Sequence, residues 1–364
     1  MQNDIIVRTA TVTWITYPNF GTYLQAYALQ QVVKHLGYEN WILDDRRFVL
    51  SAPWRACLGR IKRWLLRKPQ VKVINPAFSQ FRQQYLQIDE HWRDDADLNR
   101  RYDMFLCGSD QIWTPYARKI NPYYFLGFTD KKKVAYAPST GTPKFTEDYQ
   151  AVVRPLLNRF SAIGVREKSC AEALSGFVDQ RVEAVLDPTL LLTDTQWEAV
   201  CAPVNDAEEA PYLLCYFLTP NAWYLEYAKR ESRQKGLRLK VFNTWQGAQT
   251  YGDDCMDVGP SEFLSYIRGA RRVMTDSFHA SIFSILFHKD FVTFKRFQNG
   301  GERDQNARIA DLFSDLGLST YFVGEDRLNG VAQLSRPDYE AVERSLQRLR
   351  SHSIQFLRKA LGER

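Results

Sequence analysis

The residues best placed to do chemistry lie in one short stretch, from Thr275 to His279, between two apolar segments. The run before it has the character of a buried strand, and the run that starts at Ala280 has that of a buried helix. In open α/β sheets, ligands bind where strand ends meet helix N-termini. A His at such a joint titrates near neutral pH, so we predict that His279 is an acid/base or an anion contact. The alternative is an Asp or Ser helix cap beside a packed His.

Other predicted strands also end in polar or glycine-containing joints. The chain opens with a β-branched strand over 5–15, a turn over 17–21, a helix over 23–36 ended by Gly37, and a strand over 41–43. This β-loop-α-β order predicts a parallel sheet. Further strands are predicted over 102–107, 133–137, 160–165, 183–186, 212–217, 237–242, 272–275 and 291–294, and helices over 223–235, 261–269 and 338–361.

This order favours an α/β protein with two Rossmann-like parallel-sheet domains facing a cleft. We expect a first domain over 1–200, a second over 201–335, and a C-terminal helix within 336–364 that packs back across both. The acidic, small-residue stretch 203–210 is the best candidate for a linker.

Composition limits the function classes. The chain has 364 residues, 45% hydrophobic and 25% charged, which suits a soluble globular protein of two domains. The net charge of +6 permits anionic partners, but no recognisable nucleic-acid motif accompanies it. The six cysteines are far apart and predict neither a zinc site nor disulfides. No signal-peptide pattern or run of about 18 apolar residues is present, so a cytoplasmic location is expected.

Residues 54–68 stand apart because they combine a helical apolar face, including Trp54 and Trp64, with six cations and no anion. Basic amphipathic helices with tryptophan suit the surface of a membrane that carries acidic lipid. We therefore expect peripheral membrane contact at the inner face, with access to a lipid-linked sugar. The alternative is a helix that packs on the sheet and exposes its basic face to water.

Seven pieces of the chain, in order, resemble the polysaccharide pyruvyl transferase family. The pieces are 19–29 (NFGTYLQAYAL), 108–113 (GSDQIW), 135–139 (AYAPS), 165–169 (VREKS), 186–191 (LDPTLL), 275–280 (TDSFHA), and 308–309 with 316–318. The resemblance implies a GT-B-like fold with a metal-independent site in the cleft. It also implies transfer of the pyruvyl group of phosphoenolpyruvate, as co-substrate, to a sugar of a polysaccharide or lipid-linked glycan as a ketal, with no other cofactor.

Ketal formation from an enol phosphate needs a positioned acid/base and several anion-holding donors. We assign the acid/base role to His279 and a role as base toward a sugar hydroxyl to Asp110. The candidates for donor binding are Arg166, Asp276, Ser277, Lys295, Arg296 and Arg308. Many family members carry Arg where this chain has Ser277, which supplies no charge. Lys295, Arg296 or Arg308 is therefore expected to compensate.

The candidates for acceptor binding follow the first and third predicted strands. They are Asn19, Gly21, Gln25, Gly108, Ser109, Gln111 and Trp113. Several have plainer alternatives: a tight turn for Gly21, a core position for Trp113, and an ion pair with Glu167 for Arg166. Asp187 is interpreted as a strand-end cap.

Two other functions stay open. A glycosyltransferase that uses a nucleotide sugar could share this fold, and so could a non-catalytic glycan-binding or assembly subunit.

Overall fold

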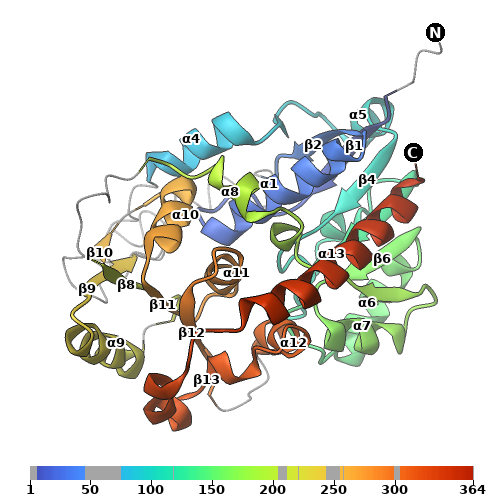
Figure 1. The fold of residues 1–364 in the computed structure, drawn as a ribbon. Coiled ribbons are helices and arrows are strands. Elements are labelled where there is room, and N and C mark those ends of the chain that lie inside the picture. Colours follow the sequence, from blue (N-terminus) through green and yellow to red (C-terminus); the bar gives the residue numbers. More distant parts are fainter. Residues whose placement is uncertain are drawn as a thin grey trace, which may run out of the picture.

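The computed structural model describes residues 6–45, 75–117, 119–203, 211–219, 221–242, 255–256, 258–298 and 304–363. Two parallel sheets, with helices packed around them, form this part of the chain (Figure 1). The predicted segment 54–68 and nearly all of the predicted linker lie outside the described residues.

Seven parallel strands form the first sheet, in the order β3-β2-β1-β4-β5-β6-β7. Their bounds are β1 Arg8–Val12, β2 Glu39–Leu43, β3 Ile88–Asp89, β4 Met104–Cys107, β5 Lys132–Tyr136, β6 Ala162–Val165 and β7 Val182–Ala184. Six parallel strands form the second sheet, in the order β10-β9-β8-β11-β12-β13. Their bounds are β8 Tyr212–Tyr216, β9 Arg238–Phe242, β10 Cys255–Met256, β11 Arg272–Thr275, β12 Asp290–Phe294 and β13 Phe322–Val323.

The helices of the described residues connect these strands. They are α1 Phe20–His35, α4 Pro76–Tyr85, α5 Asp95–Arg101, α6 Glu147–Leu157, α7 Lys168–Ser175, α8 Asp194–Glu198, α9 Ala222–Gln234, α10 Pro260–Gly269, α11 Phe278–Leu286, α12 Ala307–Asp315 and α13 Tyr339–Leu361, with short 3₁₀ turns η1 Pro122–Phe125, η2 Pro188–Leu190, η5 Ser319–Tyr321 and η6 Glu325–Gln333. No helix among the described residues has the length and apolar character needed to cross a bilayer.

The predicted strands are present, usually with tighter bounds. Every residue of β4 and of β8 is buried, as expected for parallel strands that are covered on both faces. The two-residue strands β3, β10 and β13 were not predicted, because a hydrophobic period cannot be recognised in two residues. The first helix starts earlier than expected, because the Asn19 side chain caps it by accepting the Thr22 backbone N–H at 3.2 Å.

The N-terminal end of α1 is wedged between the two sheets. Phe20 stacks on Phe263 of α10 with a centroid distance of 4.3 Å, and it also contacts Tyr216 and Phe242 of the second sheet. One apolar core cluster therefore includes residues of both sheets. This packing holds the first turn of α1 against the second sheet, next to the joint that carries His279.

The C-terminal helix α13 also contacts both halves of the molecule (Figure 1). At its start, Tyr339 stacks on His288 with a centroid distance of 4.5 Å. Near its end, Phe356 lies 6.3 Å from the ring of Tyr136 in β5. Between them, the Ser353 hydroxyl accepts the Leu186 backbone N–H at 2.9 Å. The start of the helix thus contacts the turn after α11, and its later turns contact the β5–β7 side of the first sheet.

Candidate functional site

The polar joints of the two sheets meet where their strands end. In the first sheet, Ser109 and Asp110 follow β4, Ser139 follows β5, Arg166 and Glu167 follow β6, and Asp187 follows β7. In the second sheet, Asp276, Ser277 and His279 lie at or just beyond the end of β11, and Arg296 follows β12. The carboxyl ends of parallel strands share one edge of a sheet, and here the two edges face each other.

Asp187 lies at the centre of this group. Its Oδ2 accepts hydrogen bonds from Arg166 Nη1 at 2.7 Å and from Ser109 Oγ at 3.0 Å, and it lies 3.6 Å from His279 Nε2. Burial by itself would raise the pKa of Asp187, but the neighbouring His279 and Arg166 outweigh it and hold that pKa below its usual range. The carboxylate therefore stays charged beside the imidazole.

The expected cap at Asp187 is present, since its Oδ1 accepts the Thr189 backbone N–H at 3.0 Å. The sequence interpretation missed the second role of this carboxylate, which is to link Arg166 with His279. Asp187 directly follows a predicted strand, as Arg166 does, and this position could have indicated the second role of its carboxylate.

The His279 imidazole lies against Gly21 of α1. A Cβ added at Gly21 would overlap Nδ1 of that ring, so the glycine is required for the close approach. The ring is only 7% exposed, and its Nε2 has no hydrogen-bond partner among the described residues. A buried, unsatisfied ring nitrogen next to a carboxylate suits proton transfer to or from a ligand.

Arg166 is held by two carboxylates, yet it keeps free hydrogen-bonding capacity. Besides Asp187, its Nε lies 3.3 Å from Glu167 Oε1, so the alternative ion pair with Glu167 is present. Glu167 Oε1 also accepts the Ser139 hydroxyl. Arg166 Nη2 and Glu167 Oε2 have no partner among the described residues. Unsatisfied buried polar atoms are costly, so these two atoms are candidates to bind a ligand or a water molecule.

Of the three cations expected to compensate for Ser277, Arg308 lines the same cavity as Arg166 and Asp187. It is 8% exposed, and among the described residues its guanidinium makes long hydrogen bonds, of 3.4 Å, to Gln305 alone. Burial, together with the charges of Arg166 and Arg296, lowers the pKa of Arg308 to about 9. The carbon atoms at the centres of the Arg166 and Arg308 guanidinium groups lie 4.4 Å and 5.9 Å from the Phe278 ring. This pair of cations is suited to hold an anion.

The other candidate cations have partners of their own. Arg296 donates to Thr219 Oγ1 at 3.0 Å and lies 3.8 Å from Asp276 Oδ2. Lys295 places its ammonium 5.8 Å from the centre of the Phe322 ring.

Asp276 and Ser277 are occupied by local structure. The Asp276 carboxylate accepts the Leu218 and Thr219 backbone N–H groups at 2.6 and 3.0 Å, and burial raises its pKa to about 6. The Ser277 hydroxyl caps α11 by accepting the Ala280 backbone N–H at 3.4 Å. The plainer alternative, helix and loop capping, therefore describes both residues in this structure.

Two acceptor candidates, Gln25 and Gly108, fix the backbone around the site and do not line an open surface. The Gln25 amide donates to Thr13 Oγ1 at 3.0 Å and accepts the Ser109 backbone N–H at 2.9 Å, so it fixes the loop after β4. A Cβ at Gly108 would overlap the carbonyl oxygen of Tyr136, and its φ of 121° also requires glycine.

Asp110 and Gln111 lie closer to the second sheet. Asp110 Oδ2 accepts the Thr22 hydroxyl at 2.6 Å, and its Oδ1 accepts the Gln111 backbone N–H at 2.8 Å. The Gln111 side chain donates to Gln305 Oε1 at 3.0 Å. Sequence reasoning could not find Gln305, because it follows no predicted strand and meets Gln111 only through the tertiary fold.

The interpretation of Trp113 as a stacking face for a sugar does not fit. Its ring is fully buried, stacks on Phe125 with a centroid distance of 5.2 Å, and donates to the Tyr124 carbonyl at 2.9 Å. A sugar stacks on an exposed aromatic face, and Trp113 offers none. The plainer alternative, a core residue, describes it.

The expected cleft is closed at the site. His279, Arg166 and Arg308 are each less than a tenth exposed. A cavity of about 50 Å³ is lined in part by Arg166, Asp187, Phe278 and Arg308. One water occupies about 30 Å³ in the liquid, so this cavity is too small for a phosphorylated three-carbon acid. Among the residues described by the structure, no group of three or more His, Cys, Asp or Glu side chains could hold a metal ion.

Two parallel sheets whose strand ends face each other define a GT-B-like fold. Solved structures agree on the fold. The UDP-GlcNAc 2-epimerase of Methanocaldococcus jannaschii, in complex with UDP-GlcNAc and UDP, has a TM-score of 0.52 at 10% identity over 94% of this chain and 99% of that one. The UDP-N-acetylglucosamine 2-epimerase of Rickettsia bellii has a TM-score of 0.51 at 10% identity over 97% and 98%.

The family model of polysaccharide pyruvyl transferase matches residues 19–296. The chain belongs to that family, as the sequence resemblance predicted. No curated protein sequence matches the chain.

Proposed function

We propose that this protein transfers the pyruvyl group of phosphoenolpyruvate to two hydroxyls of a sugar in a polysaccharide or lipid-linked glycan, as a ketal. The observation that carries the proposal is a pair of buried side-chain nitrogens, His279 Nε2 and Arg166 Nη2, which both lie near Asp187 and have no hydrogen-bond partner among the described residues. Imidazole and guanidinium groups are what an enol phosphate that bears a carboxylate requires.

In the proposed reaction, the methylene carbon of the donor is protonated and one sugar oxygen attacks the neighbouring carbon. The second sugar oxygen then forms its bond to the same carbon as the carbon–phosphate oxygen bond breaks. Of the two hydroxyl protons, one ends on the methyl group and the other on phosphate, so the transfer is balanced.

His279 carries a proton in this scheme, and its Nε2 lies 3.6 Å from the Asp187 carboxylate. Arg166 and Arg308 hold the carboxylate and phosphate of the donor. Their charges also favour departure of the phosphate, because they stabilise the negative charge that develops on it. Asp110, which is 7% exposed, accepts a proton from a sugar hydroxyl.

Because the site is closed, the substrates enter by a separation of the two sheet layers. The Gln111–Gln305 hydrogen bond and the bond of the Ser169 hydroxyl to Asp311 at 2.7 Å cross between the layers beside the site and would open with them. Closure over bound substrate excludes water from the reactive carbon.

The test measures phosphate release from phosphoenolpyruvate with a panel of glycosides. We expect release that depends on the acceptor, and its loss in His279→Gln but not in His91→Ala, which changes an exposed His. Thermal melting with phosphoenolpyruvate or with nucleotide sugars separates the alternatives, because a ligand of the folded state raises the melting temperature. Stabilisation by a nucleotide sugar alone, with no phosphate release from phosphoenolpyruvate in the presence of any acceptor, would overturn the proposal in favour of a glycosyltransferase.

A further inference from the structure

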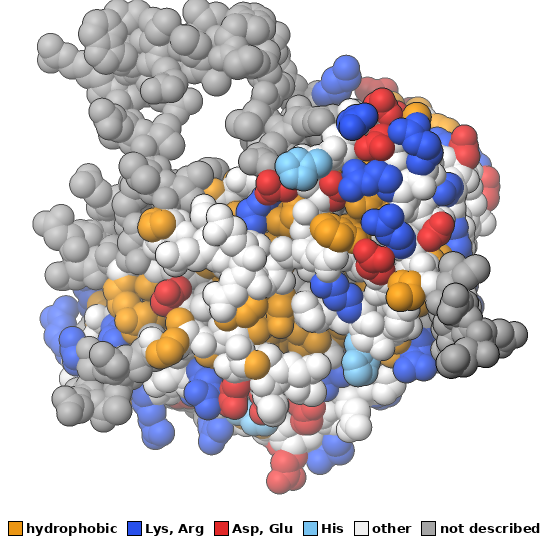
Figure 2. Space-filling model, turned by 90° about the horizontal axis from the view of Figure 1, so that it is seen from above, with side chains coloured by type: hydrophobic (Ala, Val, Ile, Leu, Met, Phe, Trp, Pro, Cys, Tyr) orange, Lys and Arg blue, Asp and Glu red, His pale blue; other side chains and the backbone are white. Residues whose placement is uncertain are grey.

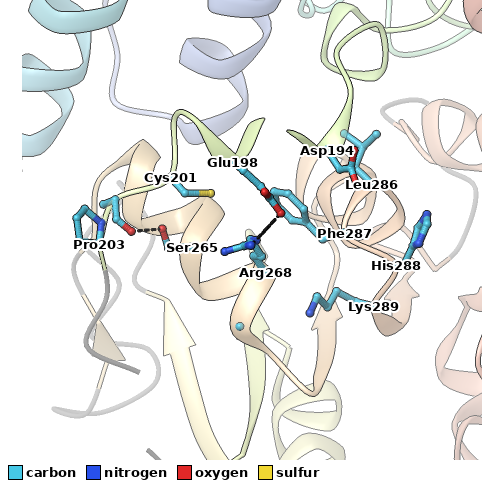
Figure 3. Close-up of a pocket in the computed structure, with 12 residues that line it drawn as sticks. Asp194, Glu198, Cys201, Pro203, Ser265, Arg268, Leu286, Phe287, His288 and Lys289 are labelled. Carbon is cyan, nitrogen blue, oxygen red and sulfur yellow. Dashed lines mark hydrogen bonds and ion pairs between the residues drawn. The ribbon is translucent and has the colours of Figure 1, made fainter. Parts of the chain in front are cut away.

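A second hollow lies at the other end of α11 from His279. It is a groove of about 640 Å³ between α8, the last turn of α10 and the turn that follows α11 (Figure 3). Glu198, Cys201, Arg268, Phe287 and Lys289 are among its lining residues. Small-molecule sites have volumes of about 300–1,000 Å³, so the groove has the size of a ligand site. The nine residues of α11, about 13 Å of helix, separate it from the site described above.

The electrostatic environment of Lys289 in this groove is unusual, because several other cations act on its ammonium group. The residue is partly buried, and burial lowers the pKa of its ammonium, as do the charges of Arg268, Arg336 and Arg271. The carboxylate next to it in sequence, Asp290, is held by Arg272 at 2.7 Å. Three guanidinium groups therefore act on one ammonium, and each contributes repulsion.

The acidic side chains of the groove do not offset this repulsion. Figure 3 shows Asp194 and Glu198 on the α8 side and Arg268, His288 and Lys289 on the α10 and α11 side. Glu198 pairs with Arg268 at 2.8 Å, but both side chains are about half exposed. An exposed pair of this kind contributes about 1 kcal/mol or less, so it leaves Arg268 available to a stronger anion.

The rest of the wall is partly apolar. Phe287 and the edge of Leu286 line the groove beside Lys289, and Pro203 lies across from them. A ligand with an anionic group and a larger neutral part could therefore place the anionic group beside the cations and the neutral part against the apolar side chains.

We propose that this groove binds a phosphate-bearing ligand, whose phosphate is held by Lys289 and Arg268 and whose neutral part lies against Phe287. A phosphate dianion would relieve the repulsion among the four cations and accept charge-assisted hydrogen bonds from the two that line the groove. This inference does not depend on the proposed function, since it uses none of the residues around His279.

Pyridoxal 5′-phosphate is a probe for such a site, because its aldehyde condenses with a lysine amine, with loss of water, and borohydride reduces the imine to a stable amine. We expect half-labelling of Lys289, mapped by mass spectrometry, at a concentration at least about 10-fold lower than that needed with pyridoxal, which lacks the phosphate. Both aldehydes react with the same amine, so comparing them removes the effect of the lowered Lys289 pKa on the rate of labelling. Lys229, an exposed lysine paired with Glu226, serves as the internal control and should show little preference.

The double variant Arg268→Gln, Arg271→Gln should remove most of the preference at Lys289, and inorganic phosphate should protect Lys289 in the unchanged protein. Equal labelling by the two reagents, or a preference that persists in a double variant with an unchanged melting temperature, would overturn the proposal. Flotation with vesicles of phosphatidate in phosphatidylcholine then separates the sources of the phosphate. If the protein binds the vesicles and Lys289→Gln abolishes that binding, the phosphate belongs to a lipid. If Lys289 prefers the phosphorylated reagent but the protein does not bind the vesicles, the ligand is soluble.

Discussion

Gly21, on the first turn of α1, leaves the space that the His279 imidazole of α11 occupies. A Cβ at Gly21 would overlap Nδ1, whereas the other ring nitrogen, Nε2, faces Asp187. The two residues are 258 positions apart in the chain, and they come from different sheet layers. The position of the ring relative to Asp187 therefore depends on the contact between the layers and on the absence of a side chain at Gly21.

The first prediction concerns this contact. In Gly21→Ala we expect the added methyl group to displace the imidazole from Asp187 and to lower kcat/KM by about 100-fold, the cost of a misplacement of about 1 Å. The melting temperature should change little, because the ring can move and alanine suits a helix. Steady-state kinetics and thermal melting measure the two effects.

The matched control for it is Gly330→Ala, where an added Cβ would meet nothing within 4 Å. A double-mutant cycle adds a sharper criterion: in a His279→Ala background, Gly21→Ala should cost nothing further. If Gly21→Ala lowers activity equally in both backgrounds, the contact is not the cause.

The second prediction concerns Asp187. Asp187→Asn removes the negative charge between Arg166 and His279 and leaves a buried guanidinium with less compensation. We expect about 3–5 kcal/mol of destabilisation at pH 7, the usual cost of breaking a buried ion pair, together with loss of activity. Denaturant unfolding measures the stability. Asp130→Asn is the control, because the Asp130 carboxylate is 96% exposed and its pair with Arg159 should contribute about 1 kcal/mol or less.

The pH dependence of this effect follows from the lowered pKa of Asp187. Its stabilising contribution is present above the ordinary carboxyl pKa of about 4 and is lost as the pH falls toward the lower pKa of the folded state. The difference in stability between the protein and Asp187→Asn should therefore be constant from pH 5 to 8 and shrink below about pH 4. A difference that shrinks instead between pH 5 and 8 would contradict the assignment.

The third prediction is that Arg308 lowers the stability of the folded protein and contributes to binding of the donor. The pKa of Arg308 is lowered to about 9, so at pH 7 the side chain is charged and the cost of burying it is fully present. Arg308→Gln should therefore stabilise the protein by about 1–2 kcal/mol and weaken binding of phosphoenolpyruvate. Thermal melting with and without the anion checks both. A variant that is destabilised, yet still stabilised by the anion as before, would show that Arg308 is only structural.

The fourth prediction concerns Asp276, whose pKa is raised to about 6. Between pH 4 and 6 the folded protein binds more protons than the unfolded chain, so the contribution of Asp276 to stability falls as the pH rises through this window. Asp276→Asn removes that dependence. Relative to the unchanged protein, this variant should gain about 2–3 kcal/mol between pH 4 and 7, since one pKa unit corresponds to about 1.4 kcal/mol. Denaturant unfolding at several pH values measures it, and a flat difference contradicts the prediction.

The charged side chains on the face that Figure 2 shows do not mark the site. Figure 2 shows Lys, Arg, Asp and Glu side chains intermixed over one face, with hydrophobic side chains gathered near its middle. The cations that matter here, Arg166 and Arg308, are buried, where a charge acts more strongly than in water.

The sequence by itself determined the two parallel sheets and the positions of the polar joints. Short runs such as 104–107 and 272–275 favour buried strands, every residue of both is buried in the structure, and each is followed at once by residues that hydrogen-bond or turn the chain. Arg166 and His279 were found for this reason, and the family was recognised from the same joints. Local sequence is sufficient for these conclusions because strand pattern and joint chemistry are both local.

Only the tertiary structure decided which joints meet and what each side chain does there. It placed Asp187 between Arg166 and His279, put Trp113 in the core, and used Ser277 as a helix cap. It also placed Arg308, one of three candidate cations, in the cavity that Arg166 and Asp187 line. Hydrogen-bond partners and desolvation depend on residues far apart in the chain, so the spacing of residues within one segment carries no information about them.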